Sequence, residues 1–298
     1  MAASFKPLFL AAALAVSAAA VAGPFDKMFG GDGGSEIDLG SLLKSAKDAF
    51  GEVQPEQERT IGREAAAVLL GAVPLVKDEA LQRYVNRVGR WVALQTERPD
   101  IDWRFGLLDS MDVNAFAAPG GYVFVTKGLL LRMGSEAELA GVLAHELTHV
   151  LQRHSMRKLV RQAGMGVLIG IVFGDVSALS QLIELSSQLD SLSFDRSQER
   201  SADDGAIEIM AAAGMSPQNL AAFFEKIQKA DAITGNIPEL FQTHPLTDER
   251  IKRVTAAAEP VQPFQFDMDW EALKQRVKHS EAIRSPANSG PATPTAEL

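Results

Sequence analysis

The chain has 298 residues, of which 46% are hydrophobic and 22% charged, so it can bury the core of one large domain or two small ones. Its formal net charge of −9 argues against a nucleic-acid partner, which requires a basic surface. The sequence contains no cysteine, which excludes disulfides and leaves only His, Asp and Glu to hold a metal ion.

The N-terminal segment has the pattern of a secretory signal peptide. Residues 1–22 combine Lys6, an alanine-rich apolar stretch and small residues at Ala20 and Ala22, which predicts export to the periplasm with cleavage after Ala22. An uncleaved membrane anchor is the alternative interpretation. The rest divides into a glycine-rich linker at 23–52, a folded domain at 53–284 and a disordered tail at 285–298.

Two helices and two strands are expected in the first part of the domain. Residues 55–70 and 78–95 have helical patterning. IDWRFGLLD, residues 101–109, alternates enough to form a strand, and YVFVT, residues 122–126, is a second β-rich run that enters a helical turn. Pro119-Gly120-Gly121 between them predicts a turn.

The second part of the domain is expected to be helical. Ser135 and Glu138 form an S-x-x-E capping box, which opens a helix that should run to about residue 157. The helical region at 164–187 contains an apolar run too short to span a membrane, which favours a buried or membrane-surface amphipathic helix. Further helices are predicted at about 195–213, 217–231, 246–258 and 270–284.

The motif HELTH, residues 145–149, predicts a metal site. His145 and His149 are four residues apart on a helix and therefore project from one face, where both imidazoles can reach one zinc ion. Glu146 lies about 100° around the helix, where it can act on a water molecule as a general base. Two core histidines satisfied by backbone groups are the alternative, but the chain has only five histidines, which makes a chance match improbable.

Two histidines do not complete a catalytic zinc site, which uses three protein ligands and keeps a position open for water. His154 is not expected to be the third ligand, because on a continued helix it points about 140° to 180° away from the other two. The metzincin pattern fails as well, since Gln152 and Ser155 stand at its glycine and third-histidine positions. His154 is therefore predicted to be a structural or surface residue.

SFDRSQERSADDG, residues 193–205, offers a better third ligand. Glu199 and Asp203 are four residues apart and share one helical face, and Ala202 is small enough to let another helix approach closely. Glu199 is predicted to complete a His2Glu site, and Asp203 to accept a hydrogen bond from a ligating imidazole. The other acidic candidates are Glu184, Asp204 and Glu208.

Together these segments resemble the HtpX-like and CAAX-prenyl-endopeptidase family of zinc metallopeptidases (gluzincins). The resemblance rests on four stretches in the family's order: NAFAAPGGYVFVTKGLL (114–130), HELTH (145–149), ERSAD (199–203) and THPLTDERI (243–251). It covers residues from about 55 to 258. It implies a mostly helical α+β, zincin-like peptidase domain with a small antiparallel or mixed sheet at the edge of the active-site cleft.

The resemblance also implies further site residues. His244 and Arg250 are expected to face the cleft as catalytic residues that contact the metal, its water or the oxyanion. For His244 followed by Pro245, a helix-start turn without chemistry is the alternative. The strand at the cleft is implied to include Asn114, Ala115, Phe116 and Ala117. A substrate strand is expected to pair near residues 114–118 or near residues 122–125.

The family resemblance favours a soluble branch. Membrane-embedded relatives carry several long spans, whereas this chain has none beyond its predicted signal. This difference argues against prenylated CAAX substrates and favours the periplasmic BepA- and LoiP-like members.

The leading functional hypothesis is a zinc endopeptidase with one Zn²⁺ per chain that cleaves unfolded or misfolded envelope proteins. The alternative is a chaperone-like assembly factor for outer-membrane proteins whose proteolysis is latent or rare. Expected partners are unfolded proteins, the outer-membrane protein assembly machinery and a peripheral membrane surface, and no nucleic acid is expected.

Overall fold

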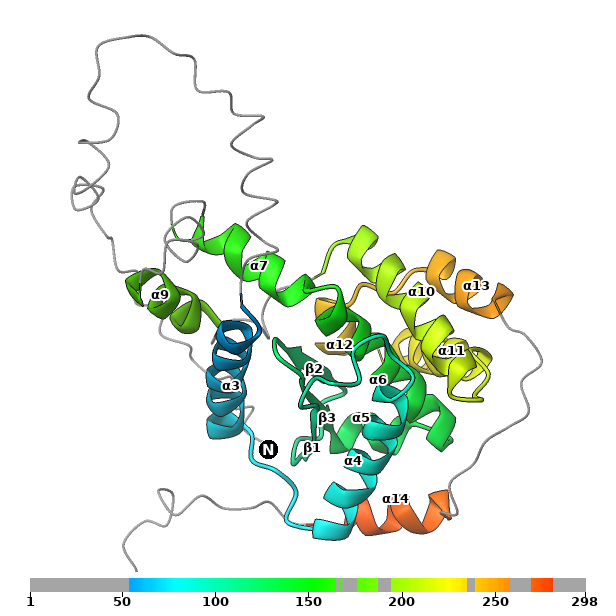
Figure 1. Ribbon diagram of the computed structural model, residues 1–298. Coiled ribbons are helices and arrows are strands. Elements are labelled where there is room, and N and C mark those ends of the chain that lie inside the picture. The colour runs from blue at the N-terminus through cyan, green and yellow to red at the C-terminus, as the bar shows by residue number, and fades with distance from the viewer. Residues whose placement is uncertain are drawn as a thin grey trace, which may run out of the picture. The chain divides into compact units, whose positions relative to one another are not determined.

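Figure 1 shows the computed structural model, which describes residues 54–164, 167, 176–186, 194–234, 239–257 and 269–280. The predicted signal peptide, linker and disordered tail lie outside the described residues, as does most of the apolar run that follows residue 164. The described part is mostly helical with one small mixed sheet, which confirms the predicted α+β class.

The helices surround the sheet and account for most of the described chain (Figure 1). They are α3 (Pro55–Ala72), α4 (Glu79–Ala93), α5 (Lys127–Arg132), α6 (Glu136–Leu151), α7 (His154–Ala163), α9 (Val176–Ser186), α10 (Arg196–Ala212), α11 (Gln218–Thr234), α12 (Glu239–Thr243), α13 (Asp248–Ala256) and α14 (Trp270–Lys278). The short helix α12 was not expected from the sequence, because five residues are too few to show a helical period.

The sheet has three strands, β1 (Arg104–Leu108), β2 (Ala115–Ala118) and β3 (Tyr122–Thr126). β3 lies in the centre, parallel to β1 and antiparallel to β2. Gly120 and Gly121 have φ values of 71° and 100°, a conformation that lets the chain turn tightly from β2 into β3. Because β3 is paired on both sides, no substrate strand can add to residues 122–125, and that part of the expectation is wrong.

The β1 edge of the sheet is covered by side-chain amides of α4. Gln82 donates to the Leu107 carbonyl oxygen and accepts from the Leu107 amide, each at 2.9 Å. Asn86 Nδ2 donates to the Phe105 carbonyl oxygen at 2.6 Å. These bonds occupy backbone groups that could otherwise form hydrogen bonds with another strand. Within the described residues, β2 is therefore the strand whose outer edge is left for a partner.

Helix α6 is the buried centre of the domain. Every residue from Glu138 to Val150 is buried, and α10 packs along it. The two helices cross closely at Gly205, where a Cβ atom would lie 2.5 Å from Cγ2 of Thr148. This crossing places the face of α10 that carries Glu199 directly on the histidine-bearing face of α6.

The start of α6 follows the sequence prediction, but its end does not. The predicted capping box forms in part: the Ser135 side chain accepts from the Glu138 amide at 3.3 Å, whereas the Glu138 carboxylate accepts from the Gly134 amide instead of the Ser135 amide. The helix ends at Leu151 rather than near residue 157, because Arg153 adopts a left-handed conformation with φ 54°. A new helix, α7, then begins in a different direction at His154.

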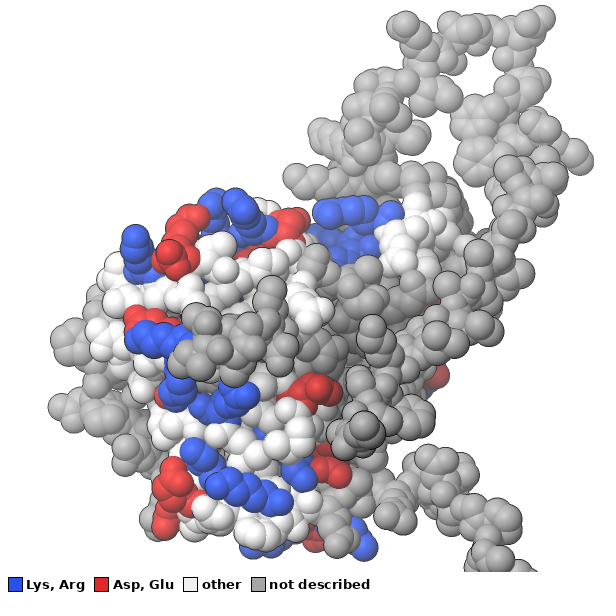
Figure 2. Space-filling view, turned by 180° about the vertical axis from the view of Figure 1, so that it is seen from behind, with Lys and Arg blue, Asp and Glu red and all other residues white. Residues whose placement is uncertain are grey.

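The described surface has a mixed charge. On the face drawn in Figure 2, Lys and Arg side chains are interspersed with Asp and Glu side chains. None of the helices in the described ranges is both long enough and apolar enough to cross a membrane.

The close approach of α3 to the β2–β3 turn yields a first prediction. A Cβ atom at Gly62 would lie 1.7 Å from the Pro119 carbonyl oxygen, so Gly62→Ala is expected to destabilise the fold by about 2 to 3 kcal/mol. Gly71→Ala on the same helix meets no atom within 4 Å and should stabilise by about 0.5 to 1 kcal/mol. Urea unfolding measures both changes, and equal midpoints for the two variants would contradict the prediction.

Candidate metal centre

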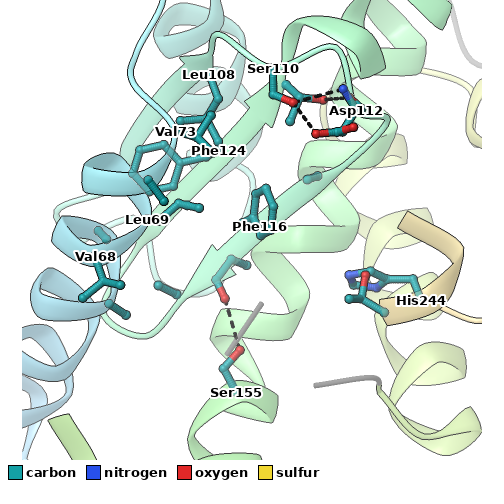
Figure 3. A pocket seen from close by; sticks show the side chains of 18 of the residues that line it. Val68, Leu69, Val73, Leu108, Ser110, Asp112, Phe116, Phe124, Ser155 and His244 are labelled. Atoms are coloured by element: carbon teal, nitrogen blue, oxygen red, sulfur yellow. Dashed lines mark hydrogen bonds between the residues drawn. The ribbon is translucent and has the colours of Figure 1, made fainter. Parts of the chain in front are cut away.

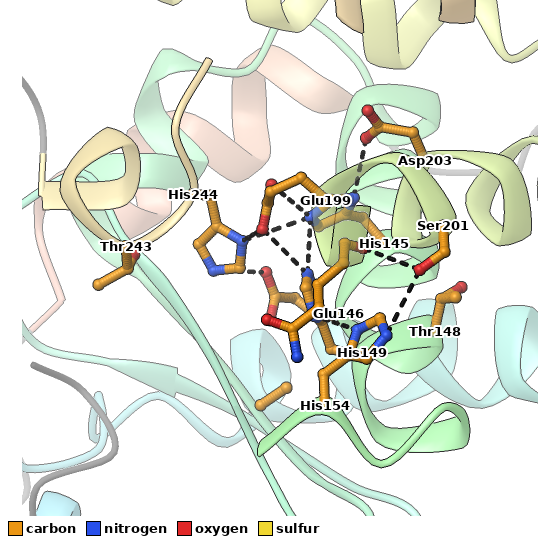
Figure 4. A network of polar contacts seen from close by, with 12 residues as sticks. His145, Glu146, Thr148, His149, His154, Glu199, Ser201, Asp203, Thr243 and His244 are labelled. Atoms are coloured by element: carbon orange, nitrogen blue, oxygen red, sulfur yellow. Dashed lines mark hydrogen bonds and ion pairs between the residues drawn. The ribbon is translucent and has the colours of Figure 1, made fainter. Parts of the chain in front are cut away.

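Two histidines project from α6 into a buried polar cluster (Figure 4). His145 is 4% exposed and His149 is fully buried. Their Nε2 atoms lie 3.1 Å apart and point toward the same space, as the four-residue spacing predicts. Both imidazoles can therefore bind one ion through Nε2.

Glu199 joins these histidines from α10. Asp195 caps that helix by accepting from the Gln198 amide at 2.9 Å, which places Glu199 in the first turn. Glu199 Oε1 lies 3.4 Å from Nε2 of His149, and Oε2 lies 3.5 Å from Nε2 of His145. The structure thus brings together the three residues that the sequence predicts as metal ligands.

His244 lies directly after α12 and contributes a fourth donor atom. Its Nδ1 atom is 3.1 Å from Glu199 Oε1 and 3.4 Å from His145 Nε2. One donor atom from each of His145, His149, Glu199 and His244 can be chosen so that all four lie within 4.8 Å of one another. The donor set of imidazole nitrogens and one carboxylate is the set that zinc prefers when thiolates are absent.

The protonation of His149 and Glu199 suits metal binding, whereas that of His145 opposes it. Burial lowers the pKa of His149 well below its ordinary value, so this ring is neutral at neutral pH. Burial acts to raise the pKa of Glu199, but the charge of His244 and the other histidine rings hold it well below the ordinary range. For His145, burial is outweighed by hydrogen bonds to Asp203 and Glu199, which raise its pKa to about 9. A metal ion must therefore displace a proton from His145.

Glu146 lies beside this cluster without a hydrogen-bonding partner. Its side chain is 1% exposed, and neither carboxylate oxygen accepts a hydrogen bond from any residue of the described ranges. His244 lies within ion-pair distance, with its Nε2 atom 3.6 Å from Glu146 Oε1. A buried carboxylate without hydrogen bonds is costly, and a cation with its water would supply the missing interaction. The residues present therefore fit a metal ion.

Asp203 and Arg250 lie behind the ligands rather than among them. Asp203 Oδ1 is 3.1 Å from Nδ1 of His145, the contact that the sequence predicts for fixing an imidazole. Arg250 donates to both Asp203 oxygens at 2.7 Å, and its Nη1 lies 2.5 Å from Glu199 Oε2. Its guanidinium is thus engaged by the two carboxylates. The sequence resemblance implied that Arg250 contacts the metal, its water or the oxyanion, whereas in the structure its guanidinium binds the carboxylates of Glu199 and Asp203.

His154 is buried and contacts a metal-ligand candidate, although the sequence offered no signal for this. Its Nδ1 atom lies 2.9 Å from Nδ1 of His149, the ring nitrogen that faces away from the cluster. Burial, with a smaller effect of the charge on Arg157, lowers the pKa of His154 to about 4. The prediction that it points away from His149 is wrong, because it assumed a helix that continues past residue 151.

An aromatic side chain that sequence reasoning missed closes one side of the cluster. The ring centre of Phe194 lies 3.8 Å from that of His149 and 4.9 Å from that of His244. The ammonium nitrogen of Lys158 lies over this ring, 2.9 Å from its centre, and burial lowers the pKa of Lys158 to about 7. Phe194 precedes α10 by two residues and has no motif of its own, so only the tertiary structure reveals it.

A cavity of about 220 Å³ runs along β2 toward the metal-site residues (Figure 3). One wall is the apolar face of α3, with Val68 and Leu69, and the opposite end is formed by His244. Phe116 of β2 projects into the space between them. Helix α3 lies before the motifs of the sequence, so its role as a cavity wall was not foreseen.

The outer edge of β2 faces this cavity. Asn114 accepts from the Thr126 amide at 3.1 Å, so the alternation of an antiparallel pair turns the backbone groups of Ala115 and Ala117 away from β3. Ser155 Oγ donates to the outward carbonyl oxygen of Ala117 at 3.1 Å. Of the four residues 114–117 named from the sequence, Ala115, Phe116 and Ala117 therefore lie in the edge strand and line the cavity, and Asn114 directly precedes the strand.

The residues of this site lie in a part of the chain that resembles known peptidases. The sequence pattern of peptidase family M48 matches residues 79–258. The beta-barrel assembly-enhancing protease of Yersinia pestis is 30% identical over 235 residues, which cover 74% of this chain and 48% of that protein. The mitochondrial metalloendopeptidase OMA1 of Schizosaccharomyces pombe is 28% identical over 221 residues, which cover 74% and 62%. Metalloprotease LoiP of Escherichia coli is 32% identical over 149 residues, which cover 48% and 58%.

Loss of the carboxylate ligand should abolish tight metal binding. Glu199→Ala is expected to weaken Zn²⁺ affinity by more than about 100-fold, because even residues behind a metal ligand contribute 10- to 100-fold. Glu208→Ala, an exposed position on the same helix, is the matched control and should bind as the unaltered chain does. Competition with a chromogenic chelator measures both affinities, and unchanged binding by Glu199→Ala would remove Glu199 from the site.

Proposed function

The chain belongs to peptidase family M48, and on this premise we propose that it is a zinc-dependent endopeptidase that cleaves unfolded or misfolded proteins of the cell envelope. The observation that carries the proposal is the buried Glu146 carboxylate, which lies without hydrogen bonds beside the His145, His149 and Glu199 cluster. A purely structural metal site would give this carboxylate no role. A peptidase requires such a base next to its metal.

Each residue of the site has a separate role in peptide hydrolysis. When bound, zinc polarises the scissile carbonyl and makes a neighbouring water molecule more acidic. Glu146 accepts the proton of the attacking water and delivers it to the amine nitrogen as the carbon–nitrogen bond breaks. His244 Nε2, which lies 3.6 Å from Glu146 Oε1, is placed to donate to the developing oxyanion. Arg250 and Asp203 hold Glu199 and His145 in place from behind.

The substrate is proposed to bind as an added strand on β2. The outward backbone groups of Ala115 and the outward amide of Ala117, whose carbonyl oxygen already accepts from Ser155, would pair with it, while the adjacent cavity takes one of its apolar side chains. Backbone pairing needs an extended segment and little specific sequence. These features favour unfolded protein as the substrate class, because folded proteins seldom expose extended chain together with apolar side chains.

We propose the periplasm as the location, with the predicted signal peptide for export and a peripheral membrane contact. The matched relative from Yersinia pestis is named for beta-barrel assembly, and this chain spans about half of its length. From that name we propose outer-membrane protein assembly as the process that this protein serves, and the assembly machinery as a partner.

A second candidate function is a chaperone-like assembly factor whose proteolysis is latent. The observation that favours it is the position of His244, whose Nδ1 lies as close to Glu199 and His145 as a fourth ligand would. Four protein ligands would leave a tetrahedral zinc ion without an open position for water. The chain would then bind precursors on β2 and cut them rarely.

The general-base role of Glu146 can be tested by removing its charge alone. Glu146→Gln is expected to keep Zn²⁺ bound while casein cleavage falls by at least about 10³-fold, because the amide cannot accept the proton of water. Casein degradation and metal content are measured together, with Glu208→Gln as the exposed control. Full activity of Glu146→Gln would refute the mechanism. If Glu146→Gln restored growth of a deletion strain as well as the unaltered gene, the binding function would be favoured.

The two candidate functions differ in what they expect of His244. As an oxyanion donor, its loss in His244→Ala should slow casein cleavage by about 100-fold. As a fourth ligand, its loss should instead open a coordination position and make cleavage faster than in the unaltered chain. Initial rates at saturating casein decide between them. Rates that differ by less than twofold would contradict both roles.

A further inference from the structure

We propose that His154 is a positioning residue that fixes the tautomer of His149, so that Nε2 of His149 is bare and available to the metal. The inference uses the metal centre of the proposed function but does not require proteolysis. It concerns a histidine that the catalytic mechanism leaves without a role and that is 1% exposed.

The two rings meet through their Nδ1 atoms. These atoms are 2.9 Å apart, a hydrogen-bonding distance, and the ring centres are 4.9 Å apart with the planes at 69°. The other nitrogen of His149, Nε2, lies 3.1 Å from His145 Nε2 and 3.4 Å from Glu199. The two nitrogens of His149 therefore face different environments, one toward the cluster and one toward His154 (Figure 4).

The direction of the hydrogen bonds between His149 and His154 follows from the contacts of Ser201, on the other side of His154. The single hydroxyl hydrogen of Ser201 can go to the Gln198 carbonyl oxygen at 3.0 Å or to His154 Nε2 at 3.4 Å, and we assign it to the closer carbonyl, which can only accept. Ser201 Oγ must then accept from Nε2 of His154, which is 3.4 Å away. A neutral imidazole that carries its hydrogen on Nε2 has a bare Nδ1. His149 must donate from its own Nδ1, and its Nε2 keeps the lone pair that a metal needs.

The turn between α6 and α7 holds His154 in this place. Arg153, in its left-handed conformation, reaches α3, where its Nε lies 2.9 Å from the buried Glu58 carboxylate. Ser155 reaches β2 through its bond to the Ala117 carbonyl oxygen. Three consecutive residues thus contact α3, a metal ligand and the sheet edge. This anchoring on both sides is what a residue needs to orient another group.

A matched pair of substitutions separates hydrogen bonding from packing. In His154→Asn the side-chain oxygen replaces Nδ1 as an acceptor. In His154→Leu the new side chain has nearly the shape of asparagine but carries no acceptor. We expect His154→Leu to bind Zn²⁺ about 10- to 100-fold more weakly than the unaltered full-length chain, and His154→Asn to stay within about threefold. Chelator competition measures these constants, and urea unfolding without added metal checks that both variants fold. Equal affinities of the two variants would overturn the proposal, whether both are tight or both are weak.

A second measurement needs no substitution. In the full-length chain loaded with Zn²⁺, long-range ¹H–¹⁵N spectra report which ring nitrogen of each histidine carries hydrogen. The proposal expects hydrogen on Nδ1 of His149 and on Nε2 of His154. Hydrogen on Nδ1 of His154 would overturn it. Both measurements remain informative if the chain proves to have no peptidase activity.

Discussion

The site depends on the close crossing of α6 and α10, where Gly205 lies against Thr148. A side chain at position 205 would push the two helices apart, because a Cβ atom would fall 2.5 Å from Thr148 Cγ2. The crossing brings Glu199 to within 3.5 Å of both histidine Nε2 atoms of α6. It also buries an arrangement of charges that is stable only when each group has a partner or a metal ion. Packing and chemistry therefore constrain the same few residues.

Each of the two α6 histidines proposed to bind the metal has a polar group on its far side. Asp203, itself held by two bonds from Arg250, faces Nδ1 of His145. His154 faces Nδ1 of His149. An anionic partner makes the first imidazole more basic, whereas a neutral partner only selects the tautomer of the second. The two ligands are thus expected to differ in how strongly they hold a proton in competition with a metal ion.

The proposed substrate-binding side of the site depends on a difference between the two edges of the sheet. Amides of α4 cover the backbone of β1, while β2 keeps outward-facing groups beside an apolar cavity. The cavity wall comes from α3, which precedes the residues that match the peptidase family. The turn at residues 153–155 contacts α3, the candidate metal ligand His149 and β2 through three neighbouring side chains.

The sequence by itself determined the local features of this protein. The four-residue spacings of His145 with His149 and of Glu199 with Asp203 fix which side chains share a helical face, and the Ser135 cap and the YVFVT run mark a helix start and a strand. Only the tertiary structure decided what lies next to these faces. A single left-handed residue, Arg153, ends α6 early and returns His154 to His149, and no periodicity reports such a break. Phe194 and α3 likewise reach the site from parts of the chain outside the motifs, because packing between helices depends on volumes and crossings that one segment does not encode.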